Sequence, residues 1–496
     1  MPLLLPGLLA ITLGSCGGGA ALPPPNPPAL PTTRLPGAGV QIDTMAFGRF
    51  GPVVLYRARA RPSRVVLFVS GDGGWNHGVV AMARSLASLD ALVVGVDIRR
   101  YLAGLTRAGG PCAYPAADFE ALSQGVQRRL GFPAYLPPVL VGYSSGAALV
   151  YAVLVQAPPG TFRAGVSLGF CPGLGLSRAL CRGGGGLSWR TGTGAHEISF
   201  APADTVQTPW VVLQGEQDST CGVVAAEKFV RQVRGAQIVR LPKVGHGFGV
   251  EAHWMPQFRE VFERLEHTNM VPAPAAPAVR DLPLVELPVH GRSGELAVIV
   301  SGDGGWASID RKIGEAFVAR GIPVVGLNSL QYFWHARTPD ETGRDLARVL
   351  RHYLAAWEGA DVLLVGYSLG ADVLPFMASR LPPDLRAHVD LVALLGASRT
   401  ASFEFHVAEW LGGAKGDRPT APEIARLRGL RVLCMYGSDE KDSVCPLLPP
   451  GSATVVRVEG GHHFGGAYSS LADTILRAAR DAEAMQTQQQ RVGPSP

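Results

Sequence analysis

The chain contains the pentapeptide GYSSG at Gly142–Gly146 and a second one, GYSLG, at Gly366–Gly370. Each follows a run of bulky apolar residues, LPPVLV in the first case and ADVLLV in the second, which is typical of a buried strand. In a strand–elbow–helix unit the central serine of G-x-S-x-G lies on a strained turn, and the glycines let strand and helix approach closely. A lone match is often only a turn of small residues. Two matches in the same setting predict nucleophiles at Ser144 and Ser368.

The pentapeptides belong to a long internal repeat. VVLFVSGDGGW at 65–75 matches LAVIVSGDGGW at 296–306 with an offset of 231 residues. From Pro115 and Pro339 onward the offset is 224, so the first copy carries an insertion of seven residues, which we place in the loop TRAGGPCAY after Leu102. Two copies of this length indicate tandem domains, each of about 200 residues and therefore able to bury its own core.

Within each copy, short apolar segments alternate with segments of helical periodicity. The strands are apolar throughout, as expected for a parallel sheet that is covered on both faces. The sequence therefore predicts the α/β class, as a tandem pair of α/β-hydrolase-like doubly wound domains with mostly parallel sheets. The strands expected in the first copy are 65–69, 92–96, 138–141, 165–168, 210–213 and 237–240. The main helices expected are 79–89, 118–130, 227–234, 309–321, 343–357 and 471–485.

Composition changes along the chain suggest the domain boundaries. We expect a signal peptide with a lipobox at 1–16, a Pro/Gly-rich tether at 17–39, a first hydrolase-like domain at 40–267, a Pro/Ala linker at 268–282, a second domain at 283–484 and a disordered tail at 485–496. The apolar N-terminus ends in LGSC, which resembles a lipobox and predicts lipidation of Cys16. We therefore expect an exported, periplasmic protein that is anchored in the membrane as a lipoprotein.

The remaining six cysteines divide evenly, four in the first copy and two in the second, as is common in an oxidising compartment. Cys434 and Cys445 are placed to form a local bridge. The cysteines of the first copy permit three pairings, and the sequence does not choose among them: Cys112, Cys171, Cys181 and Cys221. No C-x-x-C motif or histidine pair with metal-ligand spacing is present, so we expect neither a metal nor another cofactor.

The charge balance argues against nucleic acid as a partner. The net charge is only +5 over 496 residues, charged residues make up 17%, and no basic stripe is interleaved with aromatic residues.

Each copy offers the Ser–acid–His chain order of α/β-hydrolases. The second copy supplies Ser368, Asp442 and His462, and the first supplies the set formed by Ser144, Asp218 and His246. We choose Asp442 over its neighbour Asp439 because the shared D-S-x-C pattern aligns it with Asp218. A serine hydroxyl needs a histidine to accept its proton, and the carboxylate orients and stabilises that histidine.

The repeated SGDGGW segment follows a strand that comes earlier in the chain than the elbow strand, 65–69 in the first copy. At this point such enzymes place half of their oxyanion hole, and the glycines there expose backbone N–H groups. We therefore expect the oxyanion donors of the second copy at Gly302, Asp303 and Leu369, with Ser145 as the counterpart of Leu369. The alternative is a tight strand-to-helix turn without a catalytic role.

The two copies differ around the expected sites. Asp372 lies one helical turn beyond Ser368, where the first copy has Ala148. The second copy also carries SLQYFWHARTPDE, an aromatic and basic loop over the expected active-site face, which the first copy lacks. These differences predict that the second copy is the main catalytic domain and the first is subsidiary.

The segments SGDGGW, SLQYFW with RTP, GYSLGADVLPF, DSVCP and GGHHFGG together resemble the VirJ/AcvB family of bacterial virulence proteins. The resemblance is fullest over 296–466, and the two copies match the longer, two-domain type. It implies a periplasmic serine hydrolase that cleaves the aminoacyl ester of lysyl-phosphatidylglycerol, with Ser368, Asp442 and His462 as its triad. Asp372, Asp340 and Glu341 are then candidates to bind the lysyl ammonium.

The implied partners are the phospholipid substrate, the membrane surface through a lipid anchor, and proteins of a secretion system. Two other classes of function stay open. One is a non-catalytic periplasmic chaperone or scaffold for secretion substrates, and the other is a general carboxylesterase or lipase.

Overall fold

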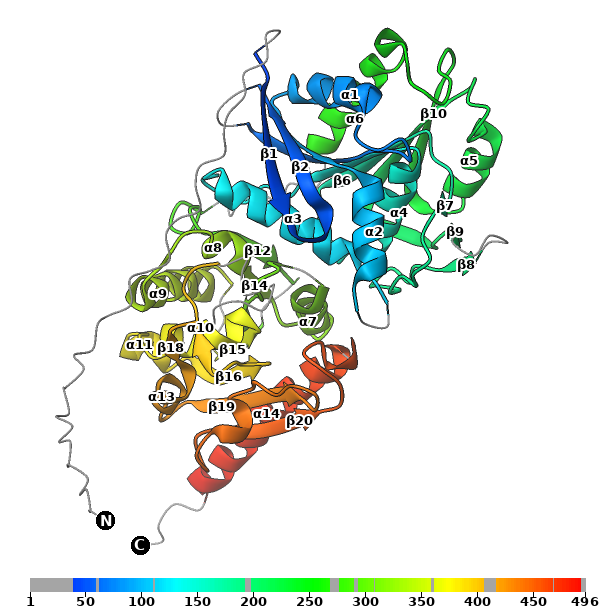
Figure 1. Cartoon of the computed structure of the whole chain (residues 1–496). Helices are drawn as coiled ribbons and strands as arrows, with labels where there is room; N and C mark the ends of the chain where they lie inside the picture. The colour runs from blue at the N-terminus through cyan, green and yellow to red at the C-terminus, as the bar shows by residue number, and fades with distance from the viewer. Residues whose placement is uncertain are drawn as a thin grey trace, which may run out of the picture.

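The computed structural model describes residues 39–491 except for 59–61, 110–111, 192–197, 268–275, 290–292, 307, 358–360, 406–415 and 467. The chain forms two α/β domains in tandem, the first running from blue to green and the second from yellow-green to red in Figure 1. The expected signal peptide, the tether and Cys16 lie outside the described residues. In the part of the chain that is described, no helix is both long and apolar enough to cross a membrane.

The first domain is built on a sheet of eight strands, in the order β1-β2-β4-β3-β5-β6-β10-β11. From β4 to β11 neighbouring strands are parallel, whereas β1 and β2 add an antiparallel edge. The bounds are β1 Gln41–Phe47, β2 Gly51–Arg57, β3 Arg64–Val69, β4 Ala91–Val96, β5 Val139–Tyr143, β6 Ala164–Leu168, β10 Thr205–Gly215 and β11 Arg234–Leu241. A small side sheet contains β7 Gly173–Leu174, β8 Trp189–Thr191 and β9 Ile198–Phe200.

The second domain repeats this order with seven strands, β12-β14-β13-β15-β16-β19-β20. Only the edge strand β12 is antiparallel to its neighbour. The bounds are β12 Leu284–Leu287, β13 Glu295–Val300, β14 Val324–Leu327, β15 Asp361–Tyr367, β16 Val389–Leu395, β19 Arg431–Gly437 and β20 Thr454–Val458. A short pair, β17 Thr400–Ala401 and β18 Arg418–Pro419, lies beside the sheet. The matching strand orders confirm the predicted tandem doubly wound fold.

Helices cover both faces of each sheet, as the uniformly apolar strands require. In the first domain one face carries α1 His77–Ala87 and α6 Met255–His267, and the other carries α2 Ile98–Arg107, α3 Pro115–Arg129, α4 Ser145–Gln156 and α5 Val223–Val230. In the second domain α7 Ser308–Val318 and α14 Tyr468–Arg491 cover one face. The opposite face carries α8 Ser329–Tyr332, α9 Pro339–Ala356, α10 Leu369–Ala378, α11 Pro383–Arg386 and α13 Thr420–Ala425.

The tryptophan that ends each SGDGGW segment packs over a glycine in the middle of the neighbouring strand. A methyl group built on Gly95 would lie 2.1 Å from the ring of Trp75, and one on Gly326 would lie 2.2 Å from the ring of Trp306. The glycines leave the space that the indole rings fill. The same packing therefore holds the turn after β3 and the turn after β13.

The repeat predicts the extra residues of the first copy in the loop TRAGGPCAY after Leu102, but Thr106 and Arg107 of that segment belong to helix α2. They lengthen α2 to ten residues, whereas its counterpart α8 has four. The loop that follows α2 is tied down by a disulfide between Cys112 and Cys181.

Two further disulfides lie in the described chain, Cys171–Cys221 and Cys434–Cys445. The second of these confirms the predicted local bridge, and the first-copy pairing that the sequence left open is now fixed. Cys221 and Cys445 align in the repeat, but their disulfide partners, Cys171 and Cys434, do not align with each other.

Two boundaries differ from those expected. Helix α14 continues to Arg491, so residues 485–491 are helical, whereas the low apolar content of this segment predicted a disordered tail. The second domain also begins earlier than 283, because Val279 and Leu282 are buried in its core. Arg348 fixes this stretch through an ion pair with Asp281.

The aromatic loop after β14 joins the two domains. The Trp334 ring is 1% exposed and packs within the core of the first domain, 5.5 Å from the Tyr135 ring. Its indole N–H donates to Phe132 O at 2.8 Å, and His335 Nε2 bonds Pro133 O at 2.8 Å. Arg128 of α3 lies over the Trp334 ring, 5.2 Å from its centroid. The loop that the sequence placed over the active site thus serves as a contact between domains.

We expect Trp334→Ala to weaken the coupling between the domains. Removing a buried tryptophan costs about 3–5 kcal/mol, and here the lost contacts are those that connect the two cores. Urea unfolding followed by circular dichroism should change from one transition to two, with the first shifted to lower urea. Trp357→Ala removes a partly buried tryptophan inside the second domain and serves as control. Identical single transitions for both variants would contradict the assignment.

Candidate active sites

Both elbow serines have the strained backbone that the motif predicts. The φ angle is 57° at Ser144 and 53° at Ser368, in the left-handed region that residues other than glycine rarely adopt. A methyl group built on Gly142 would lie 2.2 Å from Gly146 O, so strand β5 and helix α4 meet without room for a side chain. Each serine immediately precedes the first residue of a helix, α4 or α10, at the carboxyl edge of the parallel strands.

In the first domain the structure brings the three predicted triad residues together. Ser144 Oγ lies 3.0 Å from His246 Nε2, and His246 Nδ1 lies 2.8 Å from Asp218 Oδ2. The Asp218 side chain is fully buried, and its Oδ1 accepts the backbone N–H groups of Thr220 and Cys221 at 2.9 and 2.7 Å. These bonds satisfy the carboxylate while it orients the imidazole, as general-base activation of serine requires.

In the second domain the acid beside His462 is Glu440. Glu440 Oε1 accepts a hydrogen bond from His462 Nδ1, and Oε2 accepts the N–H of Gly437 at 2.5 Å. Burial alone would raise the pKa of Glu440, but the bonds from His462 and Gly437 outweigh it and hold this pKa below its usual value. The prediction of Asp442 was wrong: Asp442 is exposed, and so is its rival Asp439.

The turn after the strand explains why the alignment failed. The acid is the third residue after the last glycine of the strand in both copies, Asp218 after Gly215 and Glu440 after Gly437. The same backbone bonds form there, since the acid N–H donates to the glycine carbonyl at 3.3 Å in the first copy and 3.0 Å in the second. The second copy has two extra residues between the acid and the aligned cysteine. Counting from the strand-end glycine would have found Glu440.

The serine–histidine contact differs between the domains. Ser144 is hydrogen-bonded to His246, whereas no direct bond joins Ser368 Oγ to His462 Nε2 among the contacts of the described residues. Such bonds are often long before substrate binds. Tyr367, the second residue of GYSLG, has its ring 5.2 Å from the His462 ring. Its hydroxyl lies 3.1 Å from His463 Nδ1.

The predicted oxyanion donors lie beside the nucleophiles. A methyl group built on Gly302 would lie 3.4 Å from Ser368 Cβ, and one on Gly71 would lie 3.0 Å from Ser144 Cβ. Leu369 and Ser145 are the first residues of their helices, where backbone N–H groups have no acceptor within the helix. Gly302 and Leu369 thus both lie next to Ser368, and the neighbouring Asp303 is close enough to Glu120 of the first domain to act on it electrostatically.

The disulfide Cys171–Cys221 anchors the acid loop of the first domain, because Cys221 N–H is one of the donors to Asp218. Asp218, Cys221 and His246 are close enough to suggest a metal site. The disulfide removes the thiolate that would bind the metal, and the triad bonds use the other two groups.

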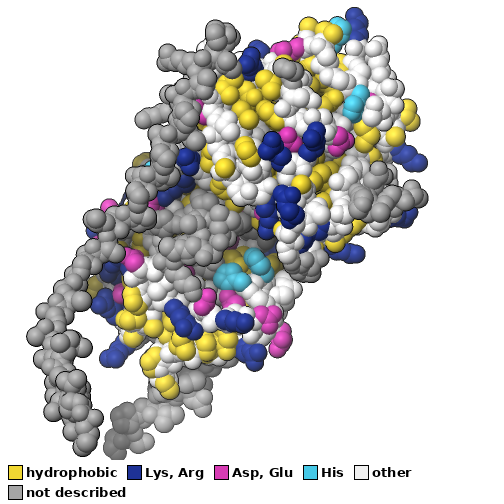
Figure 2. All heavy atoms as spheres, in the orientation of Figure 1, with side chains coloured by type: hydrophobic (Ala, Val, Ile, Leu, Met, Phe, Trp, Pro, Cys, Tyr) yellow, Lys and Arg dark blue, Asp and Glu magenta, His cyan; other side chains and the backbone are white. Residues whose placement is uncertain are grey.

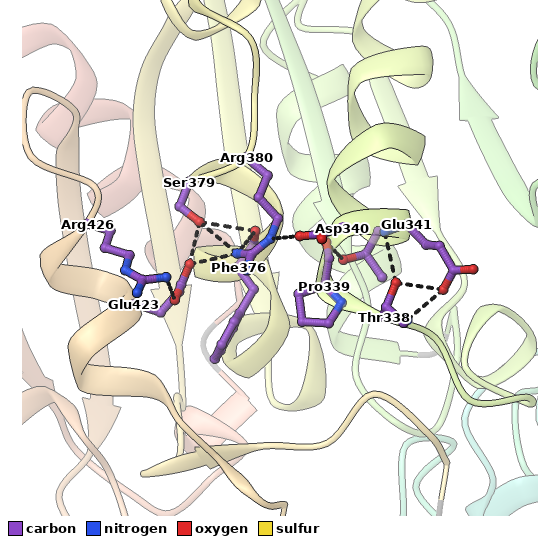
Figure 3. A network of polar contacts seen from close by, with 10 residues as sticks. Thr338, Pro339, Asp340, Glu341, Phe376, Ser379, Arg380, Glu423 and Arg426 are labelled. Atoms are coloured by element: carbon purple, nitrogen blue, oxygen red, sulfur yellow. Dashed lines mark hydrogen bonds and ion pairs between the residues drawn. The ribbon is translucent and has the colours of Figure 1, made fainter.

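The three carboxylates predicted to bind the substrate have other partners. Asp372 is buried, and its Oδ1 accepts the N–H of Ser398 at 2.5 Å, so it fixes the loop after β16. Figure 3 shows Asp340 and Glu341 at the start of α9. Asp340 pairs with Arg380 at 2.6 Å, and Glu341 forms a capping box with Thr338. These contacts explain how the three carboxylates support the local structure.

Comparison with known protein families shows the family to which the chain belongs. A family model described as "Bacterial virulence protein (VirJ)" matches residues 63–169 and 294–483, which is more than half of the chain. The chain belongs to the VirJ family. Both matched segments fall in the two repeated domains, so VirJ-like sequence is present in each. No curated protein matches the chain.

Solved structures similar to this VirJ-family protein include a dienelactone hydrolase from Anabaena variabilis, with 16% identity and a TM-score of 0.32. The alignment covers 46% of this chain and 98% of that one. An esterase domain from Rhodothermus marinus has 16% identity and a TM-score of 0.30, with 45% of this chain and 98% of that one covered. A serine hydrolase without a lid from Xanthomonas campestris has 18% identity and a TM-score of 0.27, with 47% and 95% covered.

Glu440→Gln should greatly reduce ester hydrolysis by the second domain. The amide cannot stabilise the imidazolium that forms on His462, and loss of a triad carboxylate costs on the order of 10⁴-fold in rate. The assay uses p-nitrophenyl acetate and the Ser144→Ala background, so that only the second site turns over.

Asp442→Asn in the same background is the matched control, since its carboxylate is two residues away and exposed. We expect this control to stay within about threefold of its parent, because surface substitutions cost little. A larger loss from Asp442→Asn than from Glu440→Gln would restore the original assignment.

Proposed function

We propose that this VirJ-family protein is a periplasmic serine esterase that cleaves the aminoacyl ester of lysyl-phosphatidylglycerol. The observation that carries the proposal is the hydrogen-bonded chain Ser144–His246–Asp218 on a strained elbow. In the second domain Ser368 lies on the same kind of strained elbow, and His462 is hydrogen-bonded to Glu440. The substrate itself rests on the resemblance to the VirJ/AcvB family.

The reaction would follow the general scheme for serine hydrolases. In the second domain Ser368 Oγ attacks the ester carbonyl carbon while His462 Nε2 takes the hydroxyl proton. The N–H groups near Gly302 and Leu369 stabilise the oxyanion. The intermediate then releases the glycerol hydroxyl of phosphatidylglycerol, which receives the proton from His462. Water attacks the lysyl-serine ester in the same way and frees lysine.

The three disulfides of the described chain support a location outside the cytoplasm, because such bonds persist mainly in oxidising compartments. A membrane-facing position would let the enzyme meet an aminoacylated lipid. Hydrolysis there would remove a cationic group and return the headgroup to its negative charge.

Ser368→Ala should abolish release of lysine from vesicles that contain lysyl-phosphatidylglycerol, with a loss on the order of 10⁴-fold. Ser144→Ala should lower the rate by less than about tenfold, as expected for a subsidiary first domain. Mass spectrometry of the released lysine measures both.

Equal losses from the two variants would show that the domains share the reaction. Turnover of p-nitrophenyl acetate without release of lysine would indicate a general carboxylesterase. A wild-type protein inactive on both substrates would favour a scaffold or chaperone.

Cys16→Ala should prevent labelling of the protein by radioactive palmitate in growing cells. The prediction rests on LGSC at the end of the apolar N-terminus and on the Pro-rich stretch that follows. Labelling and membrane fractionation of the wild type and the variant test it. Incorporation of palmitate that persists in the variant would exclude lipidation at this residue.

A further inference from the structure

One face of helix α3 in the first domain lies against the second domain. Its side chains Glu120, Gln124 and Arg128 follow one another at intervals of four residues and so share that face. Arg128 pairs with Glu404 at 2.6 Å and donates to Phe405 O at 2.9 Å. This places the C-terminal half of α3 against the loops of the second domain, as Figure 1 shows for the boundary between them.

Glu120, two turns earlier, lies beside the SGDGGW turn of the second domain. A methyl group built on Gly304 would lie 4.0 Å from Glu120 Oε1. Gly304 is two residues from Gly302, which lies against the nucleophile Ser368. The carboxylate of the first domain therefore comes close to the oxyanion loop of the second. Figure 2 shows histidine side chains on the second domain near the same boundary.

The surroundings of Glu120 favour a cationic guest. Its side chain is 7% exposed, and Asp303 faces it from the second domain. Burial, with Asp303 adding to it, raises the pKa of Glu120 to about 8. Gln124 is fully buried and donates from Nε2 to Glu120 Oε1 at 3.4 Å, and its own Oε1 has no hydrogen-bond partner among the described residues.

We propose that Glu120 of the first domain, with the amide oxygen of Gln124, binds the side-chain ammonium of the aminoacyl group in the active site of the second domain. The substrate pocket is then composite, and the first domain acts as the specificity element for the catalytic groups of its neighbour. This rests on the proposed aminoacyl esterase function.

The chemistry of these two groups fits an ammonium ion. An ammonium has three N–H donors, and the carboxylate and the amide oxygen are acceptors without a charged donor of their own among the described residues. An opposite charge nearby favours the ionised carboxyl, so the bound cation would reverse the effect of burial on Glu120. A neutral side chain would leave the buried acceptors unsatisfied, which is a strong basis for discrimination.

The test is carried out on the full chain with Ser144→Ala, so that only the second site turns over. The substrates are vesicles with lysyl-phosphatidylglycerol or alanyl-phosphatidylglycerol, which share the lipid, the ester and the α-ammonium. Glu120→Gln should lower kcat/KM for the lysyl lipid at least about tenfold and change the alanyl lipid by less than about twofold. The lysyl preference should therefore fall.

Glu404→Gln removes another carboxylate of the same interface and is the matched control, with the melting temperature of each variant recorded. Equal effects of Glu120→Gln on both lipids, or the same loss of lysyl preference in Glu404→Gln, would overturn the proposal.

A binding measurement separates this proposal from the function on which it rests. Calorimetric titration of the Ser144→Ala/Ser368→Ala protein with lysinamide and alaninamide needs no turnover. Preference for lysinamide that disappears in Glu120→Gln supports the site even if the wild type proves inactive on both lipids. Absence of that preference overturns it, even if the lysyl lipid is hydrolysed.

Discussion

The close approach of backbone to backbone at each elbow is the constraint on which both active sites depend. A methyl group built on Gly146 would lie 2.4 Å from Val69 O, and one on Gly370 would lie 2.0 Å from Val300 O. Only glycine allows the nucleophile helix to rest on the end of the strand beside the elbow strand in the sheet, β3 or β13. That contact sets the serine beside the SGDGGW turn, so nucleophile and oxyanion donors are positioned by the same packing.

The sequence was sufficient for the fold because its signals are local and occur twice. The apolar strands, the elbows and the offset repeat each predict the same doubly wound domain, and the strand orders agree with them. The first triad followed from the chain order of Ser144, Asp218 and His246. The acid of the second triad was predicted wrongly. Aligning Cys445 with Cys221 selected Asp442, which lies two residues after Glu440. The place of a catalytic acid depends on its distance from the end of the preceding strand. The D-S-x-C pattern contains no information about that distance.

The contacts between domains could not be found from the sequence. Trp334 lies in a loop rich in aromatic and basic residues, and that composition suits a binding site as well as a packed interface. Its role depends on Phe132 and Tyr135, which lie about 200 residues earlier in the chain and reach it only through the tertiary fold. Glu120 was missed for the same reason, because a single acid on a predicted helix has no distinguishing feature until a second domain buries it.

Because the indole rings of Trp75 and Trp306 rest on Gly95 and Gly326, we expect substitution of these two strand glycines to impair the protein as substitution of a catalytic residue would. Valine or isoleucine would suit an ordinary buried strand at either position. Here any side chain would displace Trp75 or Trp306, and with it the turn that borders the nucleophile. Natural variation in this lineage should therefore be restricted at these two glycines, although neither belongs to a triad. A survey of inactivating substitutions should therefore include Gly95 and Gly326 inside the sheets, although inspection of the catalytic residues alone would not identify these positions.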